Sequence, residues 1–186
     1  MKHQPFLLGK SVYLKALTGD EISERYLAWL NDENVCRFNF HHVQPFTRSK
    51  AEAYVGALSN ATDCLVLAVY ARQDDRHIGN ISLGSIDYVH RNAEFAILMG
   101  EADYWGKGLA KEAALLIVRH GFETLNLHRI HCGTHAENIA MQKLALYLGM
   151  QEEGRRRHAM FKNGSYADVI EYGVLRDEFL KCHPAK

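Results

Sequence analysis

The chain has 186 residues, enough for one domain with a sizeable core, and its 22 Lys and Arg residues balance its 22 Asp and Glu residues. A neutral chain gives no electrostatic reason to bind nucleic acid or an anionic membrane surface, so we expect neither as a partner. Small-molecule chemistry remains open, and we expect one domain over residues 1–186.

The sequence also argues against a disulfide-bonded secreted protein, a membrane protein and a metalloprotein. Cys36, Cys64, Cys132 and Cys182 are far apart and form no Cys-x-x-Cys pair, which is typical of free thiols in a reducing compartment. The apolar run at residues 5–9 is too short for a signal peptide or a membrane span, so we predict a cytoplasmic protein. Eleven histidines show no metal-ligand spacing, and we predict no metal site.

The first third of the chain predicts one strand and two helices. Residues 11–18 alternate as a strand. Residues 20–32 predict a helix with Asp20 as its N-cap, and residues 47–58 predict another that begins at Thr47.

Three strands are predicted next, over residues 64–71, 77–87 and 93–99, with bends at Gly79 and Gly84. The short connections between them predict an antiparallel meander.

The second half alternates helices and strands. A helix follows Gly108, a strand covers 128–135, a helix over 137–149 closes at Gly149, and a last strand covers 166–175. This order implies a parallel crossover. The predicted fold class is therefore α+β, with a mixed, mostly antiparallel twisted sheet of about seven strands flanked by about four helices.

The segment "DYWGKGLAKEAA", residues 103–114, places two glycines directly before a helix, where glycine is costly. A Rossmann fingerprint does not fit, because Lys111 stands where a third glycine is needed. A Walker loop does not fit either, because Lys107 is followed by Gly108. Two interpretations stay open: a plain turn, or a cradle of backbone N–H groups for a pyrophosphate.

Three runs in order, "AEFAILMGEADYWGKGLAKEA", "LNLHRIHCGTHAENIAM" and "LGMQEEG", carry a family resemblance. The chain resembles the GNAT superfamily of acetyl-CoA-dependent N-acetyltransferases, in the RimJ/RimL-like branch near the spermidine N-acetyltransferases. The likeness covers roughly residues 11–175. It implies acetyl-CoA as co-substrate and a GNAT-like form of the predicted sheet.

The resemblance also implies which residues hold coenzyme A. The turn that would bind the pyrophosphate through its backbone matches Trp105, Gly106, Lys107, Gly108, Leu109 and Ala110. The strand edge that would pair with pantetheine matches Ile97, Leu98 and Met99, and a further pantetheine contact matches Asn138. The alternatives are a plain buried strand, a solvated lysine and an ordinary helix-capping asparagine. Family members commonly have Gln or Arg where this turn begins, whereas Asp103 and Trp105 occupy that region.

For catalysis, Glu94 matches the position of a general base that removes a proton from the incoming ammonium. The alternative is an exposed strand glutamate, or one paired with Arg91. Ala145 stands where many members have a tyrosine that protonates the leaving thiolate, and Tyr147 is rotated by about 200° from that position. This departure favours a rival hypothesis, a non-catalytic acetyl-CoA-binding module, against which Glu94 argues.

We therefore expect direct transfer in a ternary complex, with a backbone N–H of residues 97–99 polarising the thioester carbonyl. The acceptor is expected to be a primary amine of a small molecule or a peptide N-terminus. The basic run Arg155–His158 favours an acceptor that also bears negative charge over spermidine. Acidic residues in and beside the first predicted helix could instead attract a polycation, or could simply be a solvated helix face: Asp20, Glu21, Glu24, Asp32 and Glu33. Association into a homo-oligomer is left open.

Overall fold

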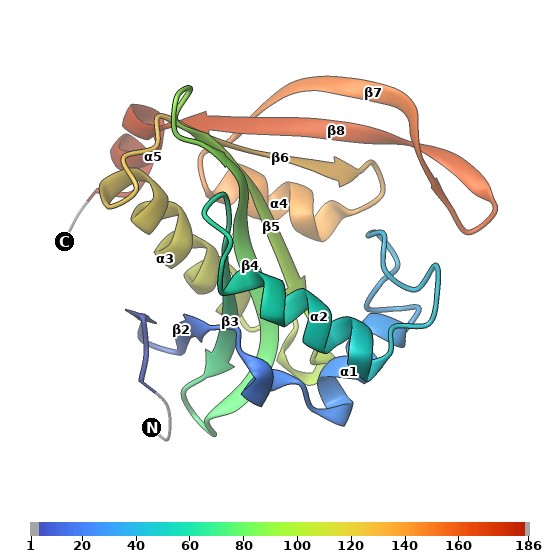
Figure 1. The fold of residues 1–186 in the computed structure, drawn as a ribbon. Coiled ribbons are helices and arrows are strands. Elements are labelled where there is room, and N and C mark those ends of the chain that lie inside the picture. Colours follow the sequence, from blue (N-terminus) through green and yellow to red (C-terminus); the bar gives the residue numbers. More distant parts are fainter. Residues whose placement is uncertain (1–3, 185–186) are drawn as a thin grey trace.

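The computed structural model describes residues 4–184, which fold around a twisted sheet with helices on both faces (Figure 1). The strands of this part of the chain are β1 (Leu7–Leu8), β2 (Val12–Ala16), β3 (Leu65–Ala71), β4 (Arg76–Asp87), β5 (Asn92–Met99), β6 (Arg129–His135), β7 (Gln151–Lys162) and β8 (Ser165–Leu175). The α-helices are α1 (Glu24–Asn31), α2 (Arg48–Leu58), α3 (Leu109–Glu123), α4 (Ile139–Tyr147) and α5 (Arg176–Cys182). Two 3₁₀-helices are η1 (Gly19–Glu21) and η2 (Ala102–Tyr104).

The strands form one sheet in the order β1-β2-β3-β4-β5-β6-β8-β7. Neighbouring strands are antiparallel except β5 and β6, which are parallel and joined by the crossover through α3. The predicted mixed, mostly antiparallel sheet and its β3–β4–β5 meander are confirmed. Residues 4–184 contain eight strands and five α-helices, close to the predicted seven and four.

The sequence analysis did not identify β7 or α5. Met160 is the one buried residue of β7, so the strand lacks the apolar alternation that reveals a strand in a sequence. The run Arg155–His158 lies in β7, at the edge of the sheet. Helix α5 is only seven residues long and buries Phe179.

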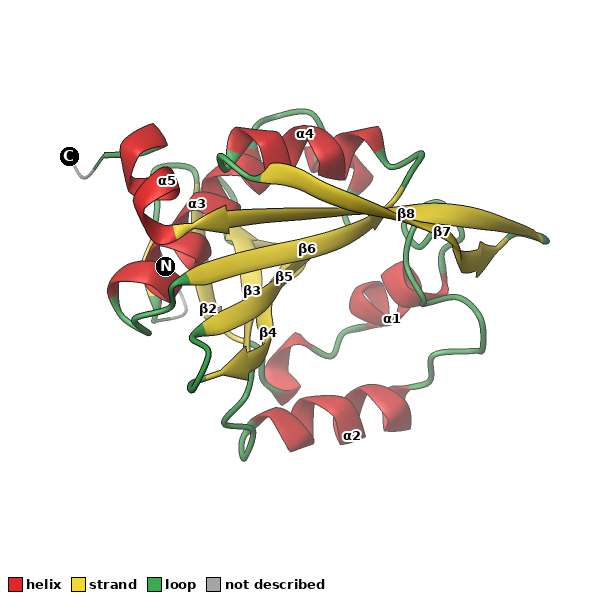
Figure 2. Ribbon diagram, turned by 90° about the horizontal axis from the view of Figure 1, so that it is seen from above, coloured by secondary structure: helices red, strands yellow, loops and turns green. Residues whose placement is uncertain are grey.

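The two faces of the sheet carry separate cores. Helices α3, α4 and α5 lie on one face, and α1 and α2 cover the other (Figure 2). In β2 the side chains alternate accordingly: Val12 and Leu14 join the core under α3, and Tyr13 joins the core under α1 and α2. In β5, Phe95 faces α3 and Leu98 packs on the α1–α2 core.

The start of α1 differs from the prediction. Asp20 is not its N-cap; Ser23 is, and its hydroxyl accepts the backbone N–H of Tyr26 at 3.2 Å. The chain makes a separate 3₁₀ turn first, because the buried Glu21 carboxylate turns back to accept the N–H of Thr18 at 2.8 Å.

The other predicted helix ends and strand bends are confirmed. Thr47 caps α2, and Gly149 ends α4 with a φ of +81°. Both predicted bends of β4 coincide with shifts in pairing register, one where Gly79 meets β3 and one after Gly84. None of the helices in residues 4–184 is long and apolar enough to cross a membrane.

Candidate active site

The strands β5 and β6 separate after a short parallel contact. Their register pairs end at Glu94 and His131, yet β5 continues to Met99 and β6 continues to His135. The other edges of these strands are paired along their length, with β4 and β8. Within the described part of the chain, residues 95–99 therefore keep one edge without a partner strand. Such an edge can pair with a ligand that carries amides.

The backbone groups on this free edge can be identified by alternation. The carbonyl of Leu98 points at Gly79 on β4, where an added Cβ would collide with it. Because successive peptide groups of a strand point to opposite edges, those of Ile97 and Met99 point into the opening. The indole N–H of Trp105 donates to the Met99 carbonyl at 2.9 Å, which agrees with this direction. Ile97 and Met99 thus form the free edge, and Leu98 lies between them.

The glycine turn is shaped as an anion cradle requires. Gly106 and Gly108 have φ values of +73° and +80°, which glycine adopts without strain. An added Cβ at either glycine would meet nothing within 4 Å, so the space beside the turn is open to a ligand. Gly108 is the N-cap of α3 and has no side chain to cap it. The first-turn N–H groups of this 15-residue helix, with its positive dipole end, face that space.

The remaining predicted turn residues surround these glycines. Trp105 is 46% exposed, although its indole N–H is held by β5. The ammonium of Lys107 lies 5.3 Å from the ring centroid of Tyr104, so it packs beside the turn. Leu109 and Ala110 are half-buried at the start of α3.

Asn138 is the N-cap of α4. Its side-chain oxygen accepts the backbone N–H of Met141 at 3.2 Å, so the capping interpretation holds for the oxygen. The carboxamide nitrogen remains as a donor, and the residue is half-buried, three positions after β6 ends. Capping and contact with pantetheine are therefore compatible.

Glu94 is exposed and lies at the point where β5 and β6 separate. Its neighbours Ala93 and Phe95 are buried in the core under α3, so its carboxylate is on the face that carries α1 and α2. Among the described residues, no ion pair joins it to Arg91. The carboxylate is thus available to a ligand at the opening.

The position expected for a thiolate-protonating tyrosine holds no acidic group. Ala145 is fully buried in the core under α3. Tyr147 faces elsewhere: its ring lies 4.7 Å from the ammonium of Lys111 and 5.4 Å from the ring of His183. No residue of the described chain is assigned as the acid.

Cys132 is the cysteine of β6, beside Glu94. Burial raises the pKa of its thiol to about 12, and the charges of Glu171 and Glu94 add to this effect. A thiol with so high a pKa is not a nucleophile at neutral pH. This agrees with transfer that does not pass through an acyl-enzyme.

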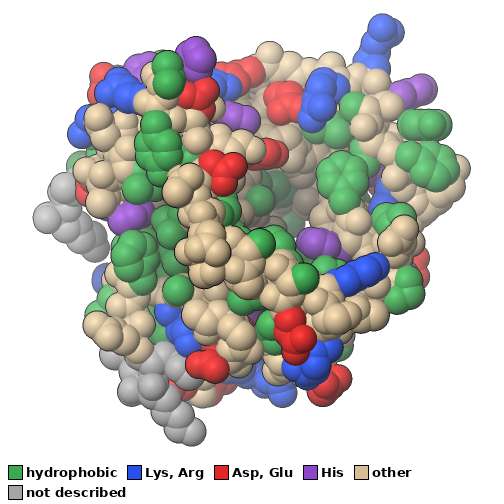
Figure 3. Space-filling view, viewed as in Figure 1, with side chains coloured by type: hydrophobic (Ala, Val, Ile, Leu, Met, Phe, Trp, Pro, Cys, Tyr) green, Lys and Arg blue, Asp and Glu red, His purple; other side chains and the backbone are tan. Residues whose placement is uncertain are grey.

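The strands β6, β8 and β7 carry three charged pairs, two of which lie on the face of Glu94. Arg156 lies 2.6 Å from Glu171 on this face. Arg155, 3.1 Å from Asp168, lies on the opposite face, because its register partner Ile170 belongs to the core under α3. A third pair joins Arg129 on β6 to Glu153 on β7. Acidic and basic side chains are accordingly mixed on the upper part of the face in Figure 3, which is hollowed near its centre. Of the basic run, Arg155 therefore lies on the other face and Arg156 is paired, so the run favours an anionic acceptor less than the sequence indicated.

The opening has two sides. We call one the cofactor side, because it holds the residues that the sequence predicts for coenzyme A: the free edge of β5, the turn over 105–110 and Asn138. We call the other the acceptor side. It comprises the loop over 32–47 between α1 and α2, and the face of β6, β8 and β7 on which Glu94 lies. Lys162 of β7 donates to the carbonyl of His41 at 2.9 Å, which ties the loop to the β7–β8 hairpin.

The sequence analysis missed one residue of the acceptor side, His135 at the end of β6. Its side chain is only 7% exposed, and its ring lies 5.2 Å from the ring of Phe38 in the loop. The alternation of β6 gave a signal, because Ile130 and Cys132 are apolar and His135 has the opposite parity. Nothing in the sequence indicated that Phe38 would cover it.

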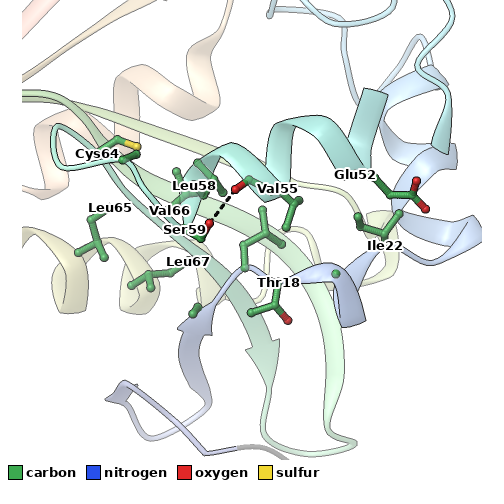
Figure 4. A pocket seen from close by; sticks show the side chains of 15 residues that line it. Thr18, Ile22, Glu52, Val55, Leu58, Ser59, Cys64, Leu65, Val66 and Leu67 are labelled. Carbon is green, nitrogen blue, oxygen red and sulfur yellow. Dashed lines mark hydrogen bonds between the residues drawn. The ribbon is translucent and has the colours of Figure 1, made fainter. Parts of the chain in front are cut away.

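A further cavity of about 680 Å³ lies between α2 and the strands β2 and β3 (Figure 4). Its walls are mostly apolar, with Val55, Leu58 and Leu67 among them. The hydroxyl of Ser59 in this wall donates a hydrogen bond to the carbonyl of Gly56 in α2. It contains none of the predicted site residues. Residues 4–184 also contain no cluster of His, Cys, Asp and Glu that could hold a metal ion.

Comparison with known proteins agrees with this geometry. Residues 12–151 match the family described as "Acetyltransferase (GNAT) domain". The spermidine N(1)-acetyltransferase of Escherichia coli strain K12 is 32% identical over 179 residues, covering 93% of this chain and 90% of that protein. Its counterpart from Vibrio cholerae serotype O1 is 35% identical over 55% of this chain and 59% of its own length. A crystal structure of spermidine N-acetyltransferase from Vibrio cholerae with CoA and spermine superposes with a TM-score of 0.83 at 27% identity, covering 91% of this chain and 98% of that one.

Proposed function

The chain belongs to the acetyltransferase (GNAT) domain family and is an N-acetyltransferase that uses acetyl-CoA, and from this premise we propose how its residues carry out the transfer. The pyrophosphate of acetyl-CoA binds the turn of Gly106 and Gly108. Its pantetheine arm pairs with Ile97 and Met99 and contacts Asn138. Glu94 accepts the proton of the incoming primary amine. The observation that carries this proposal is the free edge of β5, which runs from the glycine turn to Glu94.

In the reaction, an ammonium first gives a proton to Glu94, directly or through one water. The nitrogen lone pair then attacks the thioester carbonyl carbon, so a C–N bond forms and the C–S bond breaks. The carbonyl oxygen takes up negative charge in between, and a backbone N–H of residues 97–99 that points into the opening stabilises it. The nitrogen loses a second proton, the CoA thiolate gains one, and the products are an amide and free CoA.

The thiolate of CoA receives its proton from water in this scheme. Ala145 offers no acid, and Tyr147 is engaged with Lys111 and His183. A thiol has a pKa near 8.5, so its conjugate base is a far better leaving group than an alkoxide and depends less on an acid. Loss of the tyrosine is therefore compatible with turnover.

We propose as acceptor a primary amine on a small molecule or a short peptide. The carboxylates of Glu153 and Glu171 on the neighbouring strands are paired with arginines, which leaves Glu94 to receive the amine. Spermidine is the second candidate. It is favoured by the two relatives named as spermidine acetyltransferases and by the neutralisation of Arg156, which would otherwise repel a polycation.

The test is acetyl-CoA consumption, followed as free thiol release, with a panel of amines. The panel holds spermidine, 1,4-diaminobutane, short peptides with free N-termini and nucleotide-linked amino sugars at equal concentration. Saturable thiol release and a mass increase of one acetyl group on a primary amine are expected. If none of these amines causes thiol release, the proposed acceptor class is wrong. Calorimetry of acetyl-CoA binding separates a wrong acceptor from a protein that does not bind the donor.

A further inference from the structure

His135 is one of a small number of polar side chains that are more than nine-tenths buried in the described chain. It ends β6, four residues beyond the register partner of Glu94, where β5 has already turned away. By strand parity it lies on the same face as Glu94, and its contact with Phe38 confirms that it faces the loop over 32–47. It therefore belongs to the wall that an acceptor would touch.

The protein fixes which ring nitrogen of His135 is a donor. Nδ1 accepts the backbone N–H of Glu137 at 3.1 Å, so the proton of the neutral ring is on Nε2. Within residues 4–184, Nε2 has no hydrogen-bond partner, yet it is not one of the two fully buried side-chain nitrogens without one. The small exposed part of the ring therefore includes Nε2–H. A buried ring thus presents one N–H donor to the acceptor side.

From this we infer that His135 selects the acceptor, by donating its Nε2–H to an oxygen of the molecule whose amine reacts at Glu94. The inference rests on the proposed function and deepens it. An ammonium group has only donors and gains nothing from an N–H, whereas a carbonyl, carboxylate, hydroxyl or phosphate oxygen does. The substrate class is therefore a primary amine that also carries a hydrogen-bond-accepting oxygen, with the exposed part of the Phe38 ring as a packing surface beside it.

The register gives the scale of this molecule. Four residues of β6 separate His135 from the level of Glu94, which is roughly 13 Å along the strand. A molecule that reaches both therefore carries its amine and its oxygen on the order of 10 Å apart. A peptide of three or four residues and a nucleotide-linked amino sugar both meet this requirement. Spermidine has the length but no oxygen.

The experiment compares kcat and KM for three acceptors in the intact protein: spermidine, a tetrapeptide with a free N-terminus and a nucleotide-linked amino sugar. His135→Phe keeps a ring against Phe38 and removes the donor. His135→Gln places an amide N–H near the position of Nε2. The matched control is His120→Phe, because His120 also packs on a phenylalanine ring, that of Phe6 at 5.0 Å, but lies on α3 away from the opening.

The wild type is expected to prefer an oxygen-bearing acceptor to spermidine. His135→Phe should lower kcat/KM for that acceptor on the order of 10-fold, mainly through KM, as expected for one lost hydrogen bond. Spermidine turnover and the KM for acetyl-CoA should change less than about 2-fold, and His135→Gln should recover most of the loss. The tetrapeptide and the amino sugar distinguish the two sources of the oxygen.

A wild type that prefers spermidine would overturn the inference. So would an equal loss for all three acceptors in His135→Phe, or the same selective loss in His120→Phe, because either result indicates a structural effect. The proposed function fails in a different way, with no thiol release for any primary amine in the wild type.

Discussion

The two sides of the opening between β5 and β6 are built from different chemical groups. The cofactor side presents backbone groups: the N–H and C=O of Ile97, the N–H of Met99, and the N–H groups of the turn around Gly106 and Gly108. The acceptor side presents side chains: a buried histidine, and two arginines, Arg129 and Arg156, paired with carboxylates of neighbouring strands.

This difference matches the two partners. Acetyl-CoA always has the same phosphates and amides, which backbone groups recognise without any particular side chain. Acceptors differ between enzymes, and side chains can change while the sheet stays the same. We therefore expect substitutions on the cofactor side to alter binding of acetyl-CoA for every acceptor, and substitutions on the acceptor side to alter the choice of amine.

The largest effect should come from Glu94, which stands where the two sides meet. Glu94→Gln keeps the shape and removes the base, so kcat should fall by about 10² to 10⁴-fold, while the Kd for acetyl-CoA changes less than about 2-fold. Steady-state kinetics and calorimetry measure the two quantities. Glu153→Gln is the control, since that carboxylate is on a neighbouring strand and paired with Arg129. A Glu94→Gln enzyme with most of its activity at neutral pH would remove Glu94 from the mechanism.

The next largest effect should come from changing Gly106 and Gly108 together to valine. The new side chains fill the open space beside the turn, so the affinity for acetyl-CoA should fall by at least about 100-fold, through lost contacts between phosphate and N–H groups. Both sites have positive φ, which adds strain of about 1–2 kcal/mol per residue. Gly164→Val is the matched control, because Gly164 has a φ of +80° and open space around it but lies in the β7–β8 turn.

Calorimetry at 25 °C and a thermal melt of each variant separate binding from folding. Unchanged acetyl-CoA affinity in the double variant would show that this turn is not the pyrophosphate site. An equal loss of affinity in Gly164→Val would assign the effect to strain.

A smaller effect is expected from Gly100, which lies where α1 packs against the sheet. A Cβ at Gly100 would overlap the indole of Trp29 in α1, whose N–H donates to Glu101 at 2.8 Å. Gly100→Ala should therefore lower the free energy of unfolding by about 1–3 kcal/mol, as overpacking of a core does. Because α1 leads into the loop over 32–47, the KM for the amine should rise more than the Kd for acetyl-CoA.

Denaturant unfolding and kinetics measure these changes. The control is Gly56→Ala in α2, where the added methyl meets open space and should stabilise the protein by up to about 1 kcal/mol. A Gly100→Ala protein as stable as the wild type would mean that α1 can shift without cost, and that the acceptor side is less firmly seated than its contacts indicate.

The same division explains what the sequence could predict. The cofactor side depends on local backbone geometry, and local geometry leaves a trace in residue types: two glycines before a helix, or an asparagine at its first turn. The positive φ values and the open space at Gly106 and Gly108 confirm that these glycines are needed for the turn. The roles of these residues in binding remain predictions.

The acceptor side could not be predicted in the same way, because it depends on pairings between distant segments. Arg156 meets Glu171 only because β7 folds back along β8, and β7 has no apolar pattern to reveal it. His135 meets Phe38 across 97 residues of sequence, and no spacing rule connects them. The local pattern also gave a wrong N-cap at Asp20. The buried Glu21 carboxylate accepts the N–H of Thr18 and forms a separate 3₁₀ turn before α1.

The smallest effect tests the ion pairs themselves, through two substitutions that remove the same charge. Arg156→Ser and Arg157→Ser each delete one arginine of β7. Only the first exposes a carboxylate, because Glu171 pairs with Arg156 and lies over Gly133, about 3.0 Å from the site of an added Cβ. Among the described residues Arg157 has no carboxylate within 4.0 Å, so its loss uncovers nothing.

If the acceptor side works through side-chain charge, Arg156→Ser should lower the KM for spermidine by about 3-fold at low salt, since half-exposed ion pairs contribute about 1 kcal/mol or less. The effect should fade at about 0.5 M salt, where charges are screened within a few ångströms. Arg157→Ser should change the KM by less, and the double variant Arg156→Ser with Glu171→Gln should return to the wild-type value, since the uncovered charge is then gone. Equal shifts for the two arginines would mean that the acceptor side responds only to net charge. In that case the local pairing on β7 and β8 has no role in choosing the amine.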